Sequence, residues 1–442
     1  MDYRESVSFL FGLGKFAPTP GMVRMEPLLR GLGDPQRGLR VIHVAGTNGK
    51  GSTCAFIDSA LREMGSDTIL FTSPHLHTVR ERMRRNGEMI SREDFARIAS
   101  RVRDLCEGVA SETGEHPTFF EILAAIMYRW AADCGVDYVV QEVGLGGRFD
   151  ATNVIREPLV TVITDVDLDH TEVLGSTLAE IAGEKAGIIK PGVPLVVGPV
   201  KPEALRVIAG IASDRDAPMQ VLHADTSGVS SPTFGTPRVS RCGAIFSYRG
   251  VRWCFPEVSI AMLGGHQVRN AALAVAALEA IAHRIDISPG ITVEGIGKAR
   301  WPGRVELVAC EPVVILDGAH NTSGARVFSE CLGELFADRC IHAVIGIMGD
   351  KDASAMLRAM AERITGWVAV TRPPIPRATP EDALKELAEV ALGGAQGVSA
   401  HADPDDAVDA VLARANPGDV VVVWGSLYLV GAVRGRWVPD HS

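Results

Sequence analysis

A glycine-rich segment near the start of the chain contains the residue types that bind phosphate. Residues 41–57 read VIHVAGTNGKGSTCAFI, so an apolar run ends at Gly46 and a helical pattern begins after Lys50. In a strand–loop–helix unit of this kind, backbone N–H groups and the helix N-terminus face an anion, and a lysine adds a positive charge. Ser52 supplies a hydroxyl oxygen for Mg²⁺. Gly51 separates Lys50 from this hydroxyl, unlike in the strict Walker pattern, and the alternative is an ordinary glycine-rich turn.

Polar residues also follow three other apolar runs. Ser73 follows the run 68–72, and Glu142 follows the run 137–141. The run 159–164 is followed by Asp165, Asp167, Asp169 and His170. Because the carboxyl ends of parallel strands lie at one edge of a sheet, we expect these side chains to meet the glycine loop at one site. The alternatives are a surface carboxylate for Glu142 and a structural role for His170.

Strand-like runs alternate with helical patterns in both halves of the chain, which predicts an α/β protein with parallel sheets covered on both faces. We predict an N-terminal P-loop-type domain, mostly parallel, over residues 1–295, with small antiparallel strands added within 201–262. Residues 285–303, rich in Gly and Pro, are expected to connect the domains. A Rossmann-like domain is predicted over residues 296–442, with strands at 313–316, 343–347, 367–370 and 420–424.

Composition limits the class of protein. The 442 residues are too many for one ordinary core, and the formal net charge of −10 argues against a nucleic-acid partner. None of the 8 cysteines forms a CxxC pair, which is typical of reduced thiols. The N-terminus has no basic n-region, and the apolar stretch 420–433 is too short for a membrane span. We therefore expect a cytoplasmic protein, acting as a monomer, with no membrane or nucleic-acid partner.

The motifs together resemble the folylpolyglutamate synthase and dihydrofolate synthase family, a branch of the Mur ligases. They lie in order along nearly the whole chain: TPGMVR at 19–24, HVAGTNGKGS at 43–52, TSPHL at 72–76, TFFE at 118–121, EVGLGGRFDATN at 142–153, LDHTEVLGSTLAEIAGEKAGIIKPG at 168–192, GGHQVRNA at 264–271, WPGR at 301–304, LDGAHN at 316–321 and GSLYL at 425–429. One departure is Asp165-Val-Asp167, where uncharged small residues are expected. The sequence assigns no role to these two carboxylates.

The resemblance implies an ATP-dependent amide ligase. The γ-phosphoryl group of ATP passes to a carboxylate of dihydropteroate or of a reduced folyl-(poly)glutamate, and L-glutamate then displaces phosphate from the acyl phosphate. Alternatives are a folylpolyglutamate synthase only, or another Mur-type amino-acid ligase. Cell-wall ligases carry a domain before the phosphate loop, and the 45 residues before Gly46 are too few for one. A nucleotide switch would need an NKxD signature, which the sequence lacks.

The resemblance also implies roles for individual residues. The phosphates of ATP contact Asn48, Gly49, Lys50 and Gly51, and its remaining contacts are Asn270, Arg304 and Asp317. Two Mg²⁺ sites are implied, the first with Ser52, Ser73 and Glu142 and the second with His170. The catalytic residues are Lys50, Lys185 and His320, and glutamate contacts His320 and Ser426.

For the folate, the resemblance implies a substrate loop and an aromatic pocket. The loop contains Thr19, Pro20, Gly21 and Met22. The pocket contains Thr118, Phe119, Phe120, Glu121, Phe149, Asp150 and Ala151. Phe120 can stack on the pterin ring and Asp150 can accept hydrogen bonds from its N–H edge. The alternative is that Phe119 and Phe120 are ordinary core residues at a helix start.

Lys185 falls on the apolar side of the helix expected after Thr177. It follows Ile181 by one helical turn and precedes Ile189, so the spacing points it inward. Burial lowers the pKa of a lysine and leaves a neutral amine that can capture CO₂. The family resemblance implies a carbamylated lysine here. The alternative is an ammonium that reaches Glu180 or solvent.

Overall fold

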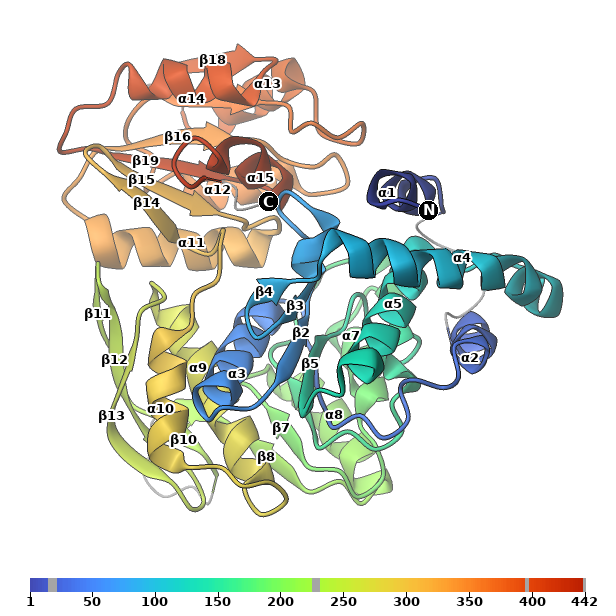
Figure 1. Cartoon of the computed structure of the whole chain (residues 1–442). Helices are drawn as coiled ribbons and strands as arrows, with labels where there is room; N and C mark the ends of the chain where they lie inside the picture. The colour runs from blue at the N-terminus through green and yellow to red at the C-terminus, as the bar shows by residue number, and fades with distance from the viewer. Residues whose placement is uncertain (15–21, 225–230, 394–396, 440–442) are drawn as a thin grey trace.

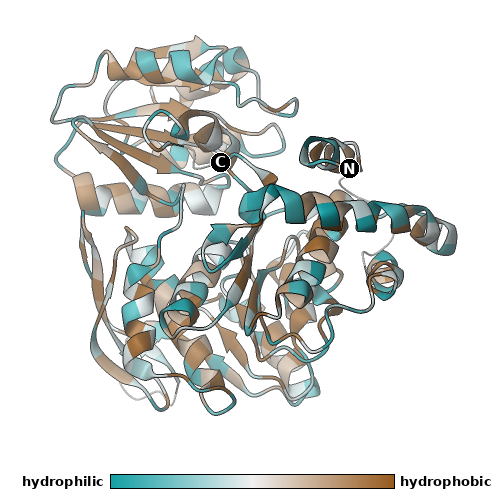
Figure 2. Ribbon diagram, viewed as in Figure 1, coloured by the Kyte–Doolittle hydropathy of each residue, from teal (hydrophilic) through white to brown (hydrophobic). Residues whose placement is uncertain are grey.

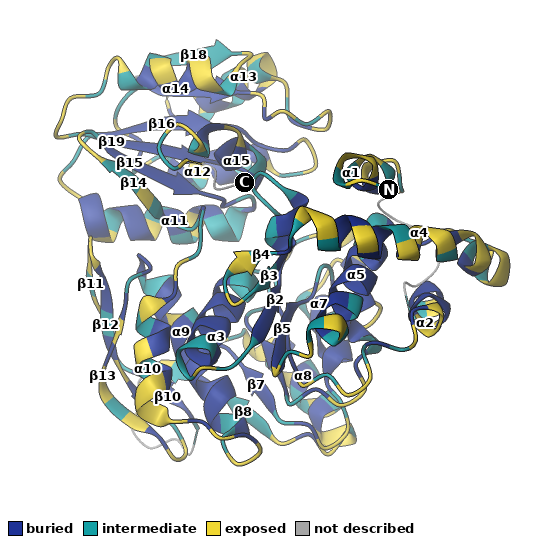
Figure 3. Ribbon diagram, viewed as in Figure 1, coloured by how far each residue is buried: buried dark blue, intermediate teal, exposed yellow. Residues whose placement is uncertain are grey.

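Two α/β domains, one above the other in Figure 1, are each built around a mostly parallel sheet. The computed structural model describes residues 1–14, 22–224, 231–393 and 397–439. The predicted α/β class and the two-domain arrangement are confirmed. The central strands of both sheets are apolar and buried, whereas the outer faces of many helices are polar and exposed (Figures 2 and 3). None of the described helices combines the length and apolar character that a membrane span requires.

The N-terminal domain contains an eight-stranded sheet in the order β4-β3-β2-β5-β1-β6-β7-β8. Its parallel strands are β2 (Thr68–Phe71), β5 (Tyr138–Glu142), β1 (Val41–Ala45), β6 (Val160–Ile163), β7 (Leu195–Val197) and β8 (Met219–Val221). The short strands β3 (Met83–Arg85) and β4 (Glu88–Met89) run antiparallel at one edge. β1, which leads into the glycine loop, lies in the middle of the sheet between β5 and β6.

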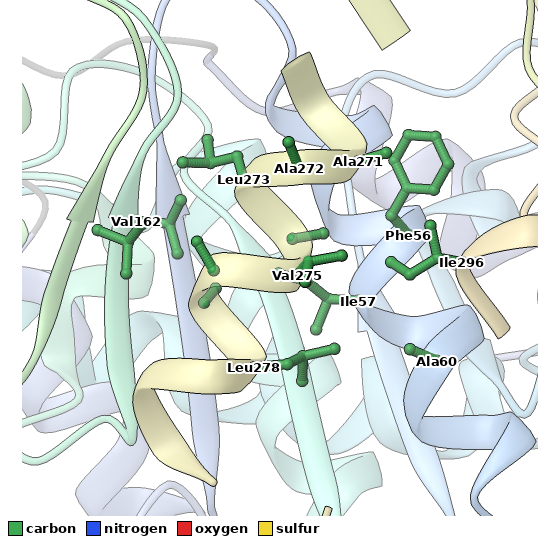
Figure 4. Close-up of a cluster of buried hydrophobic side chains, with 14 of the residues drawn as sticks. Phe56, Ile57, Ala60, Val162, Ala271, Ala272, Leu273, Val275, Leu278 and Ile296 are labelled. Atoms are coloured by element: carbon green, nitrogen blue, oxygen red, sulfur yellow. The ribbon is translucent and has the colours of Figure 1, made fainter. Parts of the chain in front are cut away.

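Alternating side chains of these strands fill two cores, one on each face of the sheet. Ile42 of β1 packs toward α3 (Lys50–Glu63), α9 (Gly265–Ile281) and α10 (Pro289–Lys298). Figure 4 shows part of this core, with Phe56, Ile57 and Ala60 of α3 beside α9 and Ile296 of α10. Val41 packs on the other face. That face is covered by α1 (Tyr3–Phe11), α2 (Met22–Gly31), α4 (Arg92–Thr113), α5 (Phe119–Cys134), α7 (Leu178–Lys185) and α8 (Pro202–Asp214).

The region 201–262 differs in part from the prediction. Its first part is the helix α8, because Pro202 occupies the first helical turn and Ala204, Ile208 and Ala212 recur at the spacing of one turn and are buried. The predicted small strands follow it. They are β9 (His223–Ala224), β10 (Thr233–Phe234), β11 (Arg238–Ser240), β12 (Gly243–Arg249) and β13 (Cys254–Ile260), paired antiparallel except for β9 with β10.

The expected interdomain connection contains a helix instead of being irregular throughout. α10 packs on α3, where Ser59 Oγ donates a hydrogen bond of 2.7 Å to the carbonyl oxygen of Gly295. Gly295 allows this close helix contact, because a Cβ atom on it would lie 2.5 Å from the Cα atom of Ala60. The predicted boundary between residues 295 and 296 therefore falls inside α10, and we propose that the first domain extends to Lys298.

The C-terminal domain has a six-stranded sheet in the order β14-β15-β19-β16-β17-β18. The strands are β14 (Glu306–Cys310), β15 (Val313–Asp317), β19 (Val420–Trp424), β16 (Ile341–Ile345), β17 (Val368–Thr371) and β18 (Val398–His401), and only β14 is antiparallel to its neighbour. Its helices are α11 (Thr322–Phe336), α12 (Ala353–Met360), α13 (Glu381–Ala391), α14 (Pro404–Leu412) and α15 (Leu427–Arg434). α11 lies along the side of this domain that faces the N-terminal domain (Figure 1).

Candidate active site

The glycine loop and the start of α3 form one wall of a cavity between the domains. Gly49 precedes α3 with a φ of 82° and makes no side-chain cap, so the first N–H groups of the helix have no partner from a capping side chain. A Cβ atom on Gly49 would lie 2.5 Å from Asn270 Oδ1, and the positive φ of this residue favours glycine. Lys50 Nζ donates to the carbonyl oxygen of Thr47 at 3.1 Å and lies 3.8 Å from Glu142 Oε1. This wall can hold phosphate groups.

Three oxygen-bearing side chains converge behind Lys50 in the same cavity. Ser52 and Glu142 are 3% and 5% exposed, and the backbone N–H of Ser73 donates to Glu142 Oε2 at 3.0 Å. Burial raises the pKa of the Glu142 carboxyl, and the nearby charge of Lys50 opposes this rise. Hydroxyl and carboxylate oxygens around a buried negative charge are the donors that Mg²⁺ prefers, so these residues fit the ion.

Lys185 lies at the end of α7, where the helix changes to a 3₁₀ turn at Ala186–Ile188 rather than continuing to Lys190. It is 3% exposed, lines the phosphate cavity, and makes no hydrogen bond or salt bridge within the described residues. Burial, together with the charge of Lys50, lowers its pKa to about 7. Its side chain faces this cavity and does not contact Glu180, whose carboxylate caps α7 at Ser176 and Thr177.

His170 also lines the cavity and is partly exposed, with a φ of 50°. Burial lowers the pKa of His170, although the neighbouring Asp169 carboxylate opposes this effect. A neutral imidazole with an accessible nitrogen can bind a metal ion.

The C-terminal domain closes this cavity with Arg304, with Asp317 at the end of β15 and with His320. Asn270 of α9 lines the cavity from the N-terminal domain. Asp317 accepts hydrogen bonds from the backbone N–H groups of Val305 and Ala319, both at 2.8 Å, so its carboxylate also shapes the loop beside Arg304.

A second cavity of ≈ 650 Å³ adjoins the first. Apolar and aromatic side chains dominate its lining, and its size is that of a site for a medium-sized organic ligand. All seven residues of the predicted pocket line it: Thr118, Phe119, Phe120, Glu121, Phe149, Asp150 and Ala151. Ser426, the N-cap of α15, also lines it. The two cavities share Ser73, Pro74, the turn at 144–146, His170, Leu174 and His320.

Family models match both domains of the chain. The Mur ligase middle domain matches residues 44–278, and the Mur ligase glutamate ligase domain matches residues 303–427. The chain belongs to the Mur ligase family. It is 38% identical over 440 residues to the dihydrofolate synthase/folylpolyglutamate synthase of Bacillus subtilis, an alignment that covers 98% of this chain and 99% of the relative. The family that the sequence motifs indicate is thereby confirmed.

Solved structures agree with this assignment. The Mycobacterium tuberculosis folylpolyglutamate synthase complexed with ADP has a TM-score of 0.90 at 30% identity, covering 99% of this chain and 98% of that chain. E. coli FolC in complex with DHPP and ADP has a TM-score of 0.86 at 29% identity, covering 99% and 97%. The Mur ligase fold of this chain thus extends over both domains.

Two predicted folate residues of this Mur ligase have other partners in the structure. Glu121 accepts hydrogen bonds from Arg24 Nε and Nη2 at 2.9 and 2.7 Å, and also caps α5 at Thr118. Asp150 accepts from the backbone N–H groups of Leu145 and Thr152 at 3.0 and 2.9 Å. Both carboxylates therefore stabilise the local structure of the cavity wall through these hydrogen bonds. Pterin binding by Asp150 stays a prediction.

The predicted substrate loop is described only at its end. Thr19, Pro20 and Gly21 lie outside the described residues, and Met22, at the start of α2, does not line either cavity.

Phe120 packs against the backbone of Gly144. A Cβ atom on Gly144 would lie 2.5 Å from the Phe120 ring, and the centroid of this ring is 5.8 Å from that of Phe71. An aromatic wall of this kind suits a flat ring.

Sequence reasoning missed several charged residues in this Mur ligase. Lys351, from the loop after β16, reaches across to Asp169 of the other domain at 2.8 Å. Arg82 is buried in the larger cavity, where its Nε donates to His75 Nδ1 at 2.9 Å and its guanidinium lies 5.3 Å from the Phe119 ring centroid. Burial lowers the pKa of Arg82 to about 10, and it has no salt bridge among the described residues. The position of Lys351 just after a strand's carboxyl end was the signal that could have identified it.

Proposed function

We propose that this Mur-type ligase uses ATP to join L-glutamate to dihydropteroate and to reduced folyl-(poly)glutamates, producing ADP and phosphate. One observation carries the proposal: the phosphate cavity and the apolar cavity meet at Ser73, the turn at 144–146, His170 and His320. A flat ring in the apolar cavity can therefore direct a carboxylate toward the γ-phosphate. The names of the Bacillus subtilis relative and of the M. tuberculosis and E. coli structures support the same reaction class.

In the first step, the substrate carboxylate takes the γ-phosphoryl group and ADP leaves. Lys50 and the N–H groups of α3 stabilise the charge on the transferred group. Ser52, Ser73 and Glu142 would hold one Mg²⁺, and His170 with a carbamylated Lys185 would hold a second. Bound Mg²⁺ neutralises phosphate charge and aligns its oxygens. Asn270, Arg304 and Asp317 would contact the rest of the nucleotide.

In the second step, the amino group of glutamate attacks the acyl carbon and phosphate leaves, so one proton must be removed from the ammonium. His320 is suited to accept it. Its Nδ1 lies 2.8 Å from the carbonyl oxygen of Gly318, which can only accept, so Nδ1 carries the proton and Nε2 presents a lone pair. Ser426, whose Oγ accepts from the N–H of Leu429 at 3.1 Å, keeps its hydroxyl proton free to bind a glutamate carboxylate.

Both cavities are formed by one chain, which supports activity as a monomer. The eight cysteines are free thiols in the structure, which supports a reducing compartment such as the cytoplasm.

Substrate-dependent ADP release tests the proposal. The purified protein, with ATP, Mg²⁺ and L-glutamate, should release ADP when dihydropteroate or tetrahydrofolyl-monoglutamate is added, and not when glutamate is omitted. Activity with tetrahydrofolyl-glutamate alone would reduce the protein to a folylpolyglutamate synthase. A rate of ADP release that does not change when either pteridine substrate is added would contradict the ligase assignment.

A further inference from the structure

The segment that follows β6 lies across the phosphate loop. It contains Asp165 and Asp167, the two carboxylates that depart from the small uncharged residues expected for the family. The structure separates their roles. Asp165 lines the phosphate cavity, whereas Asp167 does not and forms a salt bridge of 3.0 Å with the exposed Lys201.

The Asp165 carboxylate binds the beginning of the loop. Its Oδ1 accepts hydrogen bonds from the backbone N–H groups of Thr47 and Asn48, at 2.9 and 2.6 Å. Hydrogen bonds from N–H groups to a carboxylate are stronger than those between neutral groups. One oxygen atom therefore occupies the two N–H groups that lie just before Gly49.

Neighbouring contacts hold the same stretch of the loop. Thr164 Oγ1 donates to the carbonyl oxygen of Asn48 at 2.6 Å, and Thr47 Oγ1 donates to the backbone carbonyl of Asp167 at 3.1 Å. Asp167 takes part through its backbone only. The side chain of Asp165 is thus the charged contact in a set of hydrogen bonds that fixes residues 47 and 48.

We propose that Asp165 is a positioning residue for nucleotide binding in this chain. Its carboxylate orders the first half of the phosphate loop, so the N–H groups from Gly49 onward are already directed at the cavity before ATP enters. A loop that is ordered in advance costs less conformational entropy when the phosphates bind. The inference rests on the proposed ATP-dependent function, but it concerns binding of the nucleotide and not the identity of the folate.

An alternative role for a carboxylate in this cavity is direct coordination of Mg²⁺, and the amide variant separates the two roles. Asp165→Asn keeps an oxygen that can accept from Thr47 and Asn48 but loses the negative charge. Asp165→Ala loses both. Asp167→Asn removes the same charge two residues away, outside the cavity, and serves as the matched control.

The readout is the affinity for ADP without Mg²⁺, measured by calorimetry, together with KM for ATP and kcat in ADP release. We expect Asp165→Ala to weaken ADP binding about tenfold and to raise KM for ATP similarly, with kcat within about threefold. Asp165→Asn keeps the accepting oxygen but loses the charge that strengthens these hydrogen bonds, so its ADP affinity and its KM for ATP should lie between those of the wild type and Asp165→Ala. Asp167→Asn should match the wild type.

Unchanged ADP affinity in Asp165→Ala would overturn the proposal. So would an Asp165→Asn variant as weak as Asp165→Ala whose Mg²⁺ requirement rises, because that result identifies a metal ligand. If Asp165→Ala does not fold, as judged by thermal unfolding, Asp165→Ser replaces it in the same comparison. ADP binding needs no folate, so the ADP affinity can be measured even if the proposed ligase reaction is not observed. A failure of this inference can therefore be distinguished from a failure of the proposed function.

Discussion

Lys351 Nζ lies 2.8 Å from Asp169 Oδ1, and this salt bridge joins the two domains at the mouth of the phosphate cavity. Both side chains are about one-tenth exposed. Asn321 reinforces the contact, since its Nδ2 donates to Asp169 Oδ2 at 2.9 Å and to Asn48 Oδ1 at 3.2 Å. These polar contacts join the domains in the closed arrangement together with apolar contacts, such as that of Leu76 with the core of the C-terminal domain. A closed arrangement of this kind excludes water from the site.

The first prediction concerns this salt bridge. Lys351→Met should weaken the interdomain contact by about 2 kcal/mol, because it leaves Asp169 without its charged partner. We expect kcat/KM for ADP release to fall roughly 30-fold and the radius of gyration in solution scattering to increase. Lys201→Met removes a more exposed lysine from the Asp167 pair and should change neither quantity. Equal behaviour of the two variants would contradict the prediction.

The same salt bridge should withstand mild acid. Burial of Asp169 acts to raise its pKa, but the hydrogen bond from Lys351 and nearby positive charges outweigh burial, so the pKa is lowered. A carboxyl group with a lowered pKa stabilises the folded protein above its unfolded pKa of about 4, and this contribution is lost only as the pH falls through the lower folded value. Solution scattering should show the closed form from pH 8 to 5. Opening of the domains near pH 6 would contradict this.

Lys50→Ala tests the phosphate wall. Lys50 lines the cavity, and its Nζ has two polar contacts among the described residues, the Thr47 carbonyl oxygen and Glu142, so its removal should leave the fold unchanged. We expect ADP release to fall by roughly 10²-fold or more, because such a charge stabilises the transferring phosphoryl group by several kcal/mol. Lys298→Ala, which removes an exposed salt bridge with Glu63, is the control. Retention of most activity by Lys50→Ala would remove this residue from the catalytic set.

His320→Asn separates the two chemical steps. Asparagine keeps an N–H that can reach the carbonyl oxygen of Gly318 but has no acceptor at the position of Nε2. We expect glutamate-dependent turnover to fall by about 10²-fold or more, whereas hydroxylamine should still trap the acyl phosphate at a near-normal rate. Loss of both reactions would assign His320 to phosphoryl transfer instead.

The pH profile provides a second test of His320. Burial, with the nearby charge of Arg304, lowers its pKa to about 4. The imidazole is therefore neutral, and able to accept a proton, at every pH above that value. A fall in kcat/KM on the acid side near pH 6.5 that disappears in His320→Asn would contradict this environment.

The sequence predicts those parts of this site whose residues interact with neighbours in the same motif, and it does not predict contacts between residues that are far apart in the chain. The glycine loop, Glu142 and the capping box at Thr177 follow from local patterns, and the structure contains all three. The Lys351–Asp169 contact joins residues of different domains, and no local pattern contains that pairing. Glu121 shows the same limit, because its partner Arg24 lies 97 residues earlier in the chain. α10 was missed because its glycines are typical of turns, and the close packing that Gly295 permits against α3 cannot be read from the local sequence.

The last prediction is that Lys185 is carbamylated. Its amine is buried, has no partner among the described residues, and has a pKa lowered to about 7 by burial and by Lys50. Near neutral pH much of it is neutral, and the neutral nitrogen can add CO₂ with loss of one proton, which gives a carbamate anion facing His170 and the phosphates. Protonation of the amine opposes this, so the carbamate content and the activity should fall together as the pH drops below 7. Lys190 is the matched control: its pKa is lowered only to about 8, and its Nζ already donates to the carbonyl oxygen of Asn153 at 3.1 Å.

A crystal structure at neutral pH with bicarbonate should show a planar extension on Lys185 and a bare amine on Lys190. Lys185→Ala should lose activity and regain part of it with added short carboxylates, whereas Lys190→Ala should stay active. A bare ammonium on Lys185, or a fully active Lys185→Ala variant, would contradict the prediction.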